Sequence, residues 1–305
     1  MKVLLLGGSG FIGSRLAARL ADAGHQVTVF ARGLSGTVIE APDPRVARII
    51  GDINDVDAIA HALPGCEVVV HLIGSTVPSR SVSHPTEEFA KVLLPGVRVL
   101  DACVGSSVQK IVFLSSGGTV YGVPTATPVP ESHTLSPTNA YGLSKLTFEH
   151  FLSIYRYHHG LEYNVLRLSN PYGSGQRPGF GQGVIATWMH RILAGESLEI
   201  WGDGNVVRDY LCVDDAVSAI KLSVESTPSS RVFNVGSGVG HSLSEVLGIL
   251  EAVTGRSLDV AYKPQRKLDV PCNILDIALI QKELGWVPTT SLDEGMSNMW
   301  RELQR

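Results

Sequence analysis

The sequence of 305 residues has few cysteines and few charges. Its four cysteines (Cys66, Cys103, Cys212 and Cys272) are far apart and form no CxxC pair, so we expect no metal site and reduced thiols, as in a cytoplasmic protein. Charged residues make up 18% of the chain, below the roughly 25% of an average soluble protein. No run of like charges offers a basic surface for nucleic acid or for an acidic membrane.

The N-terminus also lacks a long hydrophobic run. Only four apolar residues separate Lys2 from Gly7, too few for a signal-peptide core and far short of the roughly 20 apolar residues of a membrane span. Apolar residues nevertheless make up 44% of the chain, which is enough to bury a sizeable core. We therefore expect a soluble, cytoplasmic protein that binds neither nucleic acid nor membrane.

Short apolar runs alternate with longer helical patterns in the first part of the chain. The runs are continuously apolar, as is typical of parallel strands covered on both faces. Strands are predicted at Val3–Leu6, Val27–Phe30, Val46–Ile50, Val68–Ile73, Ile111–Leu114 and Tyr163–Leu168, and helices at Ile12–Ala23, Asp57–Leu63, Pro85–Cys103 and Thr138–His158. The pattern predicts an α/β protein with a Rossmann-type, doubly wound parallel sheet.

After about Asn170 the alternation of apolar runs and helical patterns changes. Ser169–Gly183 is predicted to be a loop because it is rich in Gly, Pro, Ser and Asn. We expect residues 1–169 to form a dinucleotide-binding domain, with a return of the chain around 205–236, and residues 170–305 to form mainly a smaller α/β substrate domain. Helices are predicted there at Gln182–Gly195, Val213–Glu225, Ser242–Thr254, Ile277–Leu284 and Leu292–Leu303, and strands at Leu198–Trp201, Val232–Val235 and Leu258–Tyr262.

A glycine motif of GxxGxxG spacing directly follows the first strand and opens the first helix. Gly7 permits a tight turn, Gly10 lets the backbone approach a pyrophosphate, and Gly13 allows close packing of helix on strand. The helix N-terminus, which includes Phe11 and Ile12, offers N–H groups and a partial positive charge to phosphate. The motif predicts a dinucleotide site.

The choice between NAD and NADP stays open at the end of the second strand. The acidic residue that would bind the ribose hydroxyls is absent, and Ala31-Arg32 stands there. Arg32 would either accommodate a 2′-phosphate or stack on adenine. Asp52, next to Ile53, would either contact the adenine amino group or cap the following helix.

Tyr141 and Lys145 form a YxxxK pair on one face of a predicted helix. The Lys145 ammonium lowers the free energy of a Tyr141 phenolate, which can then remove a proton from a substrate hydroxyl while a hydride leaves the adjacent carbon. Upstream, Phe113–Gly122 ends a strand at the carboxyl edge of the sheet, where Ser115, Ser116 and other hydroxyls can bond the substrate oxygen.

These segments together resemble the extended short-chain dehydrogenase/reductase family, specifically its NAD-dependent nucleotide-sugar epimerase/dehydratase group, which includes UDP-glucose 4-epimerases. The likeness runs essentially from end to end. It rests on GGSGFIG, GDI (Gly51–Ile53), HLIG (His71–Gly74), SSGGTVYG, YGLSK, RLSNPYG (Arg167–Gly173), IWGDG with VVRDY (Ile200–Gly204, Val206–Tyr210), FNVGSG (Phe233–Gly238) and RKLDVP with LGW (Arg266–Pro271, Leu284–Trp286).

The resemblance implies roles for further residues. Asn170 matches a contact to the sugar diphosphate, Arg208 and Arg266 match the arginines that neutralise it, and Asp269 matches the acid on the nucleoside ribose. For Arg208 the alternative is a surface ion pair with Asp209 or Asp214. Leu72, Ile73 and Gly74 are implied in cofactor binding and Val184 in substrate binding. Arg177 lies where uronate epimerases carry a carboxylate-binding Arg; the alternative is a solvent-facing charge. Asn273 stands where hexose-restricted epimerases carry a bulky Tyr, and the smaller side chain leaves room for a 2-acetamido group.

Three positions depart from the family pattern. The catalytic Ser/Thr of the family aligns with Gly117, so Ser116 or Thr119 must supply that hydroxyl, or none does. Leu93 stands where relatives carry Asn, and Ala31 replaces the ribose-binding acid.

The leading hypothesis is a nucleotide-sugar 4-epimerase (an isomerase) that acts on a UDP-hexose, UDP-N-acetylhexosamine or UDP-hexuronate through transient oxidation at C4 by enzyme-bound NAD. The alternative is an NAD(P)H-dependent 4-keto-sugar-nucleotide reductase; a non-catalytic cofactor-binding protein is opposed by the intact Tyr–Lys pair. A 4,6-dehydratase is disfavoured because Gly118-Thr119 stands where it needs Asp-Glu. The resemblance also implies polysaccharide biosynthesis and a homodimer built from helices Pro85–Cys103 and Thr138–His158.

Overall fold

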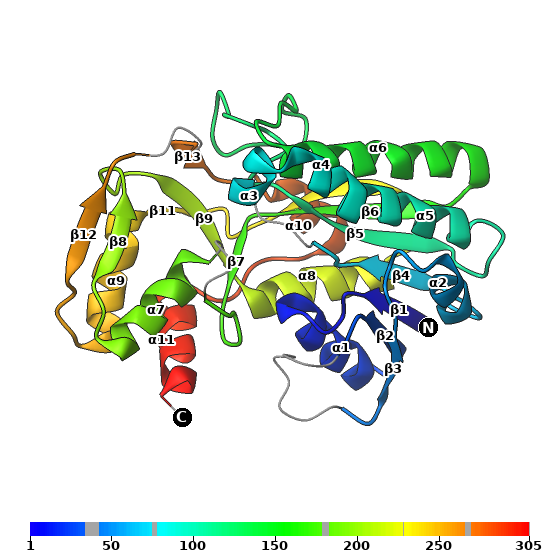
Figure 1. The fold of residues 1–305 in the computed structure, drawn as a ribbon, viewed down its shortest axis with the longest axis horizontal. Helices are drawn as coiled ribbons and strands as arrows, with labels where there is room; N and C mark the ends of the chain where they lie inside the picture. The colour runs from blue at the N-terminus through cyan, green and yellow to red at the C-terminus, as the bar shows by residue number, and fades with distance from the viewer. Residues whose placement is uncertain (34–42, 75–77, 179–182, 228, 266–269, 305) are drawn as a thin grey trace.

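The computed structural model describes residues 1–33, 43–74, 78–178, 183–227, 229–265 and 270–304. In these residues a large α/β unit adjoins a smaller unit of helices and short strands (Figure 1). No helix in the described ranges is long and apolar enough to cross a membrane.

The large unit is built on a seven-stranded sheet in which every neighbouring pair is parallel. The strand order reverses at β1 and β4, where doubly wound sheets bind ligands at their carboxyl edge. The predicted Rossmann-type fold is therefore confirmed. In order across the sheet, the strands are β10 (Arg231–Val235), β6 (Glu162–Leu168), β5 (Lys110–Ser116), β4 (Val68–His71), β1 (Lys2–Leu6), β2 (Gln26–Ala31) and β3 (Val46–Ile50).

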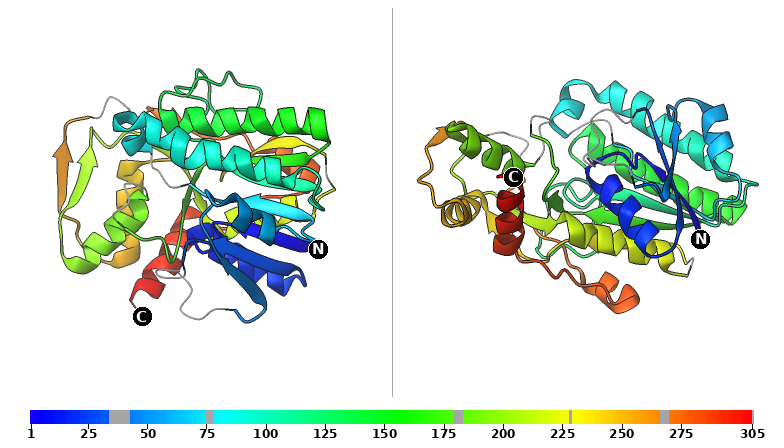
Figure 2. Two further views of the ribbon diagram at one scale, coloured as in Figure 1. Left: turned by 45° about the vertical axis from the view of Figure 1, so that its right-hand side comes forward. Right: turned by 90° about the horizontal axis from the view of Figure 1, so that it is seen from below.

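Helices cover both faces of this sheet (Figures 1 and 2). One core lies under α1 (Phe11–Asp22), α8 (Val213–Glu225) and α10 (Ala278–Leu284), and α1 and α8 lie side by side. The other lies under α2 (Val56–Ala62) and α6 (Ala140–His159), together with α5 (Leu94–Cys103). Both cores are formed by the continuous apolar runs of the strands, as expected for a sheet covered on both faces.

The helix predicted at Pro85–Cys103 is divided by a π-helical turn. α4 (Pro85–Glu88) leads into η1 (Phe89–Leu93), in which the Leu94 N–H donates to the Phe89 carbonyl, five residues back. Pro95 follows in the first turn of α5 and has no N–H to continue the α-helical pattern. α3 (Pro78–Ser83), which the sequence pattern did not predict, precedes this segment.

The smaller unit has its own hydrophobic core. It forms between α7 (Val184–Ala194), α9 (Leu243–Thr254) and α11 (Leu292–Leu303) and the parallel pair β8 (Leu198–Trp201) and β12 (Val260–Lys263).

Four short strands join this unit to the large one. In this sheet β9 (Val207–Cys212) pairs with β11 (Gly240–Ser242), β13 (Cys272–Asn273) and β7 (Asn170–Tyr172). The prediction of a loop at Ser169–Gly183 is wrong for β7, because its pairing depends on a strand distant in sequence. From β9 the chain returns to the large unit through α8 and β10.

Candidate active site

A cavity of about 710 Å³ lies between the carboxyl edge of the large sheet and the smaller unit. Its size is typical of small-molecule pockets. Its wall joins the glycine loop, the ends of β5 and β6, the start of α6, and residues of α7, β8 and β9. The predicted site residues that line it are Gly7, Gly10, Phe11, Ile12, Gly13, Leu72, Gly74, Ser115, Ser116, Thr119, Tyr141, Lys145, Asn170, Val184 and Arg208.

The glycine loop has the conformation that its sequence predicts. Gly7 has φ of +83°, which favours glycine, and its N–H donates to the Phe30 carbonyl at 2.9 Å. A Cβ on Gly13 would lie only 2.6 Å from the Gly8 Cα, so close packing of helix on loop excludes a side chain. Gly10 is different, because a Cβ there would meet only the Gly7 carbonyl oxygen, at 3.4 Å. The protein itself tolerates a side chain at Gly10, which agrees with a role in admitting a ligand to the N-terminus of α1.

Tyr141 and Lys145 both face the cavity from the first turns of α6. Asn139 caps this helix, since its side-chain oxygen accepts from the Gly142 N–H at 2.8 Å. The Lys145 Nζ lies 5.7 Å from the centroid of the Tyr141 ring and donates to the Leu114 carbonyl at 2.9 Å. Burial lowers the pKa of Lys145 to about 8 and raises the pKa of Tyr141 to about 12. The pair is thus a half-buried phenol beside a buried ammonium.

Of the two candidate hydroxyls, Ser116 is the one that acts on the tyrosine. It lowers the pKa of Tyr141, which favours the phenolate and partly offsets the effect of burial. The buried Thr119 Oγ1 has no hydrogen-bond partner among the described residues. A Cβ at Gly117 would lie 2.5 Å from the Leu275 Cδ1, so packing explains why glycine replaces the Ser/Thr of the family there.

A buried ion pair behind the site was missed in the sequence. The Glu149 carboxylate accepts from the Arg167 Nη2 at 2.6 Å and from the Ser115 hydroxyl at 2.5 Å. Arg167 also donates to the Tyr121 hydroxyl at 3.0 Å. Glu149 follows Lys145 by four residues on α6, so helix periodicity was a usable signal. Arg167 can contact Glu149 because the register of β6 on β5 places Arg167 beside Ser115.

The adenosine end of the predicted dinucleotide site has a different set of contacts. Asp52 accepts from the Asn54 N–H at 2.9 Å and its side-chain amide at 2.7 Å, and these bonds hold the pKa of Asp52 below its usual value. The cap of α2 is Asp55, not Asp52, so that alternative is wrong. Arg32 is exposed and contributes to the lowered pKa of Asp52. Ile53 is buried in the core, and none of the three predicted residues Arg32, Asp52 and Ile53 lines the cavity.

The opposite end contains Asn170 and Arg208. The Asn170 side chain donates to the Asp209 carbonyl at 3.0 Å, and Arg208 Nη1 donates to the Val207 carbonyl at 2.9 Å. The ion-pair alternative for Arg208 is wrong: Asp214 pairs with Arg15, and the buried Asp209 accepts N–H groups of loop 237–238 and of residue 275.

Several predicted residues lie elsewhere. Ile73 packs beside Gly7 and Arg177 is exposed, and neither lines the cavity. Asn273 is buried behind the strand-end loop, where its amide donates to the Gly117 carbonyl at 3.2 Å. Arg266 and Asp269 fall outside the described residues.

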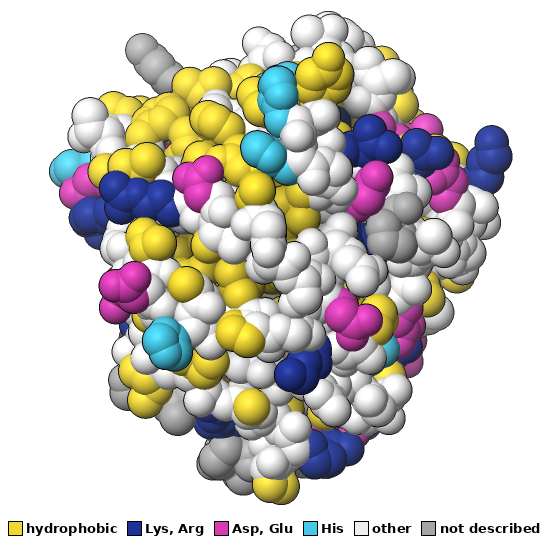
Figure 3. All heavy atoms as spheres, turned by 90° about the vertical axis from the view of Figure 1, so that its right-hand side faces the viewer, with side chains coloured by type: hydrophobic (Ala, Val, Ile, Leu, Met, Phe, Trp, Pro, Cys, Tyr) yellow, Lys and Arg dark blue, Asp and Glu magenta, His cyan; other side chains and the backbone are white. Residues whose placement is uncertain are grey.

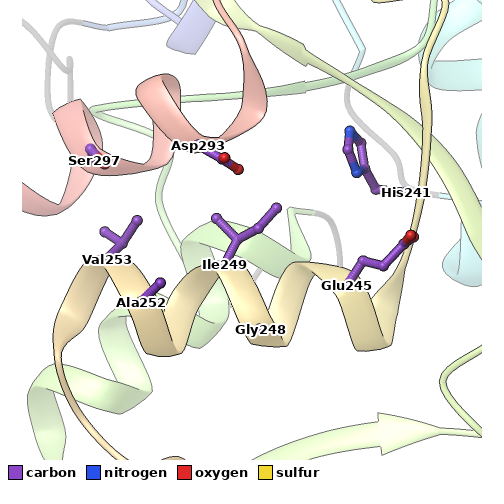
Figure 4. Close-up of a pocket in the computed structure, with 8 residues that line it drawn as sticks. All are labelled: His241, Glu245, Gly248, Ile249, Ala252, Val253, Asp293 and Ser297. Carbon is purple, nitrogen blue, oxygen red and sulfur yellow. The ribbon is translucent and has the colours of Figure 1, made fainter.

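A second hollow, of about 780 Å³, lies on the smaller unit between α9 and α11 (Figure 4). Glu245 at its edge belongs to the capping box of α9 with Ser242. Among the described residues, no predicted site residue lines this hollow.

The fold and the Tyr–Lys pair beside a glycine loop define an enzyme of the short-chain dehydrogenase/reductase type. The model of the NAD dependent epimerase/dehydratase family matches residues 3–236, and the chain belongs to this family. The resemblance inferred from the motifs is confirmed.

The similarity extends over the whole length of individual relatives. The UDP-glucose 4-epimerase of Mycolicibacterium smegmatis is 33% identical over 304 residues, 97% of this chain and 96% of that protein. The crystal structure of a Thermotoga maritima UDP-glucose 4-epimerase with UDP-glucose has a TM-score of 0.94 and 34% identity, covering 100% of this chain and 99% of the other. For the Thermus thermophilus UDP-glucose 4-epimerase complex with NAD, the TM-score is 0.92 and the identity 32%, with the same coverage.

Proposed function

We propose that the protein is a nucleotide-sugar 4-epimerase that works with bound NAD. One observation carries the proposal: Tyr141, beside Lys145, faces a cavity that also contains Ser116, the glycine loop and Arg208. The relatives described above, which match over nearly their whole length, are UDP-glucose 4-epimerases, so a UDP-hexose is the substrate that we expect first.

The residues present fit a dinucleotide. NAD would be held at Gly10, which has no side chain, and at the N-terminus of α1. It would also contact the side of the cavity formed by Leu72, Gly74 and Ser115. A dinucleotide held there would supply the hydride acceptor for oxidation at C4 of the sugar and the hydride donor for reduction from the opposite face. Because the same redox equivalent returns, the cofactor does not need to leave between turnovers.

Tyr141 would accept the proton of the 4-hydroxyl as the carbon is oxidised and would give it back on return. Ser116 lowers the pKa of the phenol, lines the same cavity and would bond the same substrate oxygen. Since burial raises the pKa of Tyr141 to about 12, the phenolate needs nearby positive charge, and Lys145 supplies it.

At the other end of the cavity, Arg208 would bind the diphosphate, because a guanidinium matches two phosphate oxygens. Asn170 and Val184 would contact the sugar diphosphate from β7 and α7. The roles inferred for Arg177, Asn273, Arg266 and Asp269 remain predictions.

The test is conversion of UDP-glucose to UDP-galactose by the purified protein without added cofactor, with UDP-N-acetylglucosamine and UDP-glucuronate in parallel. We expect turnover of at least one, and NAD in the denatured protein by mass spectrometry. Turnover that requires stoichiometric NADPH and a 4-keto sugar nucleotide would favour the reductase. No turnover of any of them would favour a non-catalytic role.

We also propose a homodimer that pairs α5 and α6 with their copies. Leu94 of α5 and Leu143, Ile154 and Tyr157 of α6 are 50%, 44%, 49% and 83% exposed. Figure 3 shows hydrophobic side chains gathered on one side of the molecule, in its upper left part. Burial of such an area in a two-fold interface would be favourable.

The proposal also assigns the binding of cofactor and substrate to different parts of the chain. Residues 1–169, with the return around 205–236, would bind the dinucleotide, and residues 170–305 mainly the sugar nucleotide. We propose a cytoplasmic location and a role in polysaccharide biosynthesis, in keeping with a nucleotide-sugar substrate.

A further inference from the structure

Glu88 is a buried carboxyl that the proposed reaction does not use. It ends α4 where η1 begins, and its side chain is inaccessible to solvent. A charge on Glu88 would act on both Tyr141 and Lys145, so the carboxyl lies within electrostatic range of the reacting pair. Its Oε1 lies 2.7 Å from the Ser144 hydroxyl, whereas its buried Oε2 has no hydrogen-bond partner among the described residues.

A count of hydrogens at Ser144 indicates the protonation state of Glu88. The Ser144 Oγ lies 2.7 Å from the Glu88 Oε1 and 3.0 Å from the Tyr141 carbonyl oxygen. A hydroxyl has one hydrogen, and a carboxylate can only accept. If Glu88 were ionised, the single hydrogen of Ser144 would have to serve both acceptors. If Glu88 is protonated, Glu88 donates to Ser144, Ser144 donates to the Tyr141 carbonyl, and both contacts are satisfied.

The Glu88 Oε2 without a hydrogen-bond partner also indicates a protonated carboxyl. A buried oxygen without a partner costs far less as the carbonyl of a neutral acid than as part of a carboxylate. The charge of Lys145 favours a Glu88 carboxylate, but Lys145 forms no ion pair with Glu88 in the described structure. Lys145 donates to the Leu114 carbonyl, and the carboxylate of Glu149 pairs with Arg167.

The remaining titratable groups nearby do not supply a charge partner. On β4, His71 is buried with both ring nitrogens unpartnered in the described structure, and burial lowers its pKa to about 3, so it is neutral. On the segment of Glu88 itself, Glu87 pairs at the surface with Arg80 and Lys91. Burial raises the pKa of Glu88 above its usual value.

We propose that Glu88 is a positioning residue that remains protonated during the reaction and holds the first turn of α6 through Ser144. An ionised Glu88 would raise the pKa of Tyr141 and so oppose the phenolate. A neutral Glu88 supports the same turn without that effect and leaves the charge of Lys145 to act on the phenol. The inference rests on the proposed function only in taking Tyr141 as the acid/base.

The first test is infrared difference spectroscopy of wild type minus Glu88→Gln at neutral pH, which requires no turnover. We expect the carbonyl stretch of a protonated carboxyl; carboxylate bands in its place would overturn the proposal. Glu88→Met gives the same subtraction if the glutamine variant does not fold. Failure of the epimerase assay with the carboxyl band present would count against the proposed function alone.

The second test is the pH profile of kcat/KM. The side-chain amide introduced by Glu88→Gln can donate to Ser144 as a protonated acid does, so we expect this variant to retain kcat within about three-fold and to keep the profile unshifted. A fall of the apparent pKa of Tyr141 by about one unit in this variant would show that wild-type Glu88 is ionised. Glu88→Met, which cannot donate, should lose kcat while Glu87→Gln, the surface control, should not. Equal activity of Glu88→Met and Glu88→Gln would also contradict the proposal.

Discussion

Ser116, at the end of β5, lowers the pKa of the phenol of Tyr141, in the first turn of α6. This relationship couples the carboxyl edge of the sheet to the helix that carries the Tyr–Lys pair. Thr119, the other hydroxyl considered for this role, faces the same cavity but has no hydrogen-bond partner in the described structure. The two residues can therefore be separated by mutation.

Ser116→Ala should lower kcat by about 10- to 100-fold, since a hydrogen bond to a charged group contributes about 1.5–3 kcal/mol. Thr119→Val, which keeps the side-chain shape, should stay close to wild type. Steady-state kinetics with the best sugar nucleotide would check both. A larger loss in Thr119→Val than in Ser116→Ala would assign the hydroxyl to Thr119.

Tyr141→Phe should abolish turnover while cofactor binding and fold persist. Loss of a positioned acid/base typically costs about 10²–10⁴-fold, and the phenyl ring preserves the packing. The measurement is kcat together with the NAD content of the purified protein and its circular dichroism. Activity close to wild type would contradict the role of Tyr141.

His71 should make the protein less stable in acid. Its pKa is about 3 when folded and 6.5 in the reference state, so below pH 6.5 the unfolded chain binds a proton that the folded protein does not. The free energy of unfolding should then decrease as the pH is lowered from 6.5 to 3, by up to about 1.4 kcal/mol per pH unit. In urea titrations at several pH values, His71→Leu should show a weaker fall than wild type, whereas the exposed His61→Leu should match wild type. Equal slopes in all three proteins would show that His71 is not buried as a neutral ring.

Ala31→Asp should tighten NAD and weaken NADP. Ala31 ends β2, and a carboxylate there could accept bonds from the ribose hydroxyls but would repel a 2′-phosphate. We expect changes of about ten-fold in Kd, measured by fluorescence titration. Arg32→Ala is the companion variant and should weaken NADP only if Arg32 meets the phosphate. If wild type binds NADPH at least about ten-fold tighter than NADH, the reductase should replace the epimerase as the proposed function.

Ile154→Glu should produce monomers if α5 and α6 form the dimer interface. A carboxylate in the centre of an apolar interface would be desolvated without a partner. Sedimentation at micromolar concentration is the measurement, and Ile50→Glu, at an exposed position of β3, is the matched control. A wild-type protein that sediments as a monomer would contradict the assembly.

The sequence by itself determined the features that arise from neighbouring residues. Apolar runs defined six parallel strands of the large sheet, since helices cover both faces of the sheet. Glycine spacing located the turn that opens α1, and the four-residue spacing of Tyr141 and Lys145 placed them on one helix face.

Only the tertiary structure decided how distant segments meet. Sequence order could not show that Ser116 rather than Thr119 acts on the pKa of Tyr141, because this depends on the angle between β5 and α6. It could not place Asn273 behind Gly117, nor join Arg167 to Glu149, because strand register sets both contacts. Glu88 looks like an ordinary helix-surface acid in the sequence. It is buried because η1 turns that segment onto α6, so its unusual surroundings arise from packing between elements.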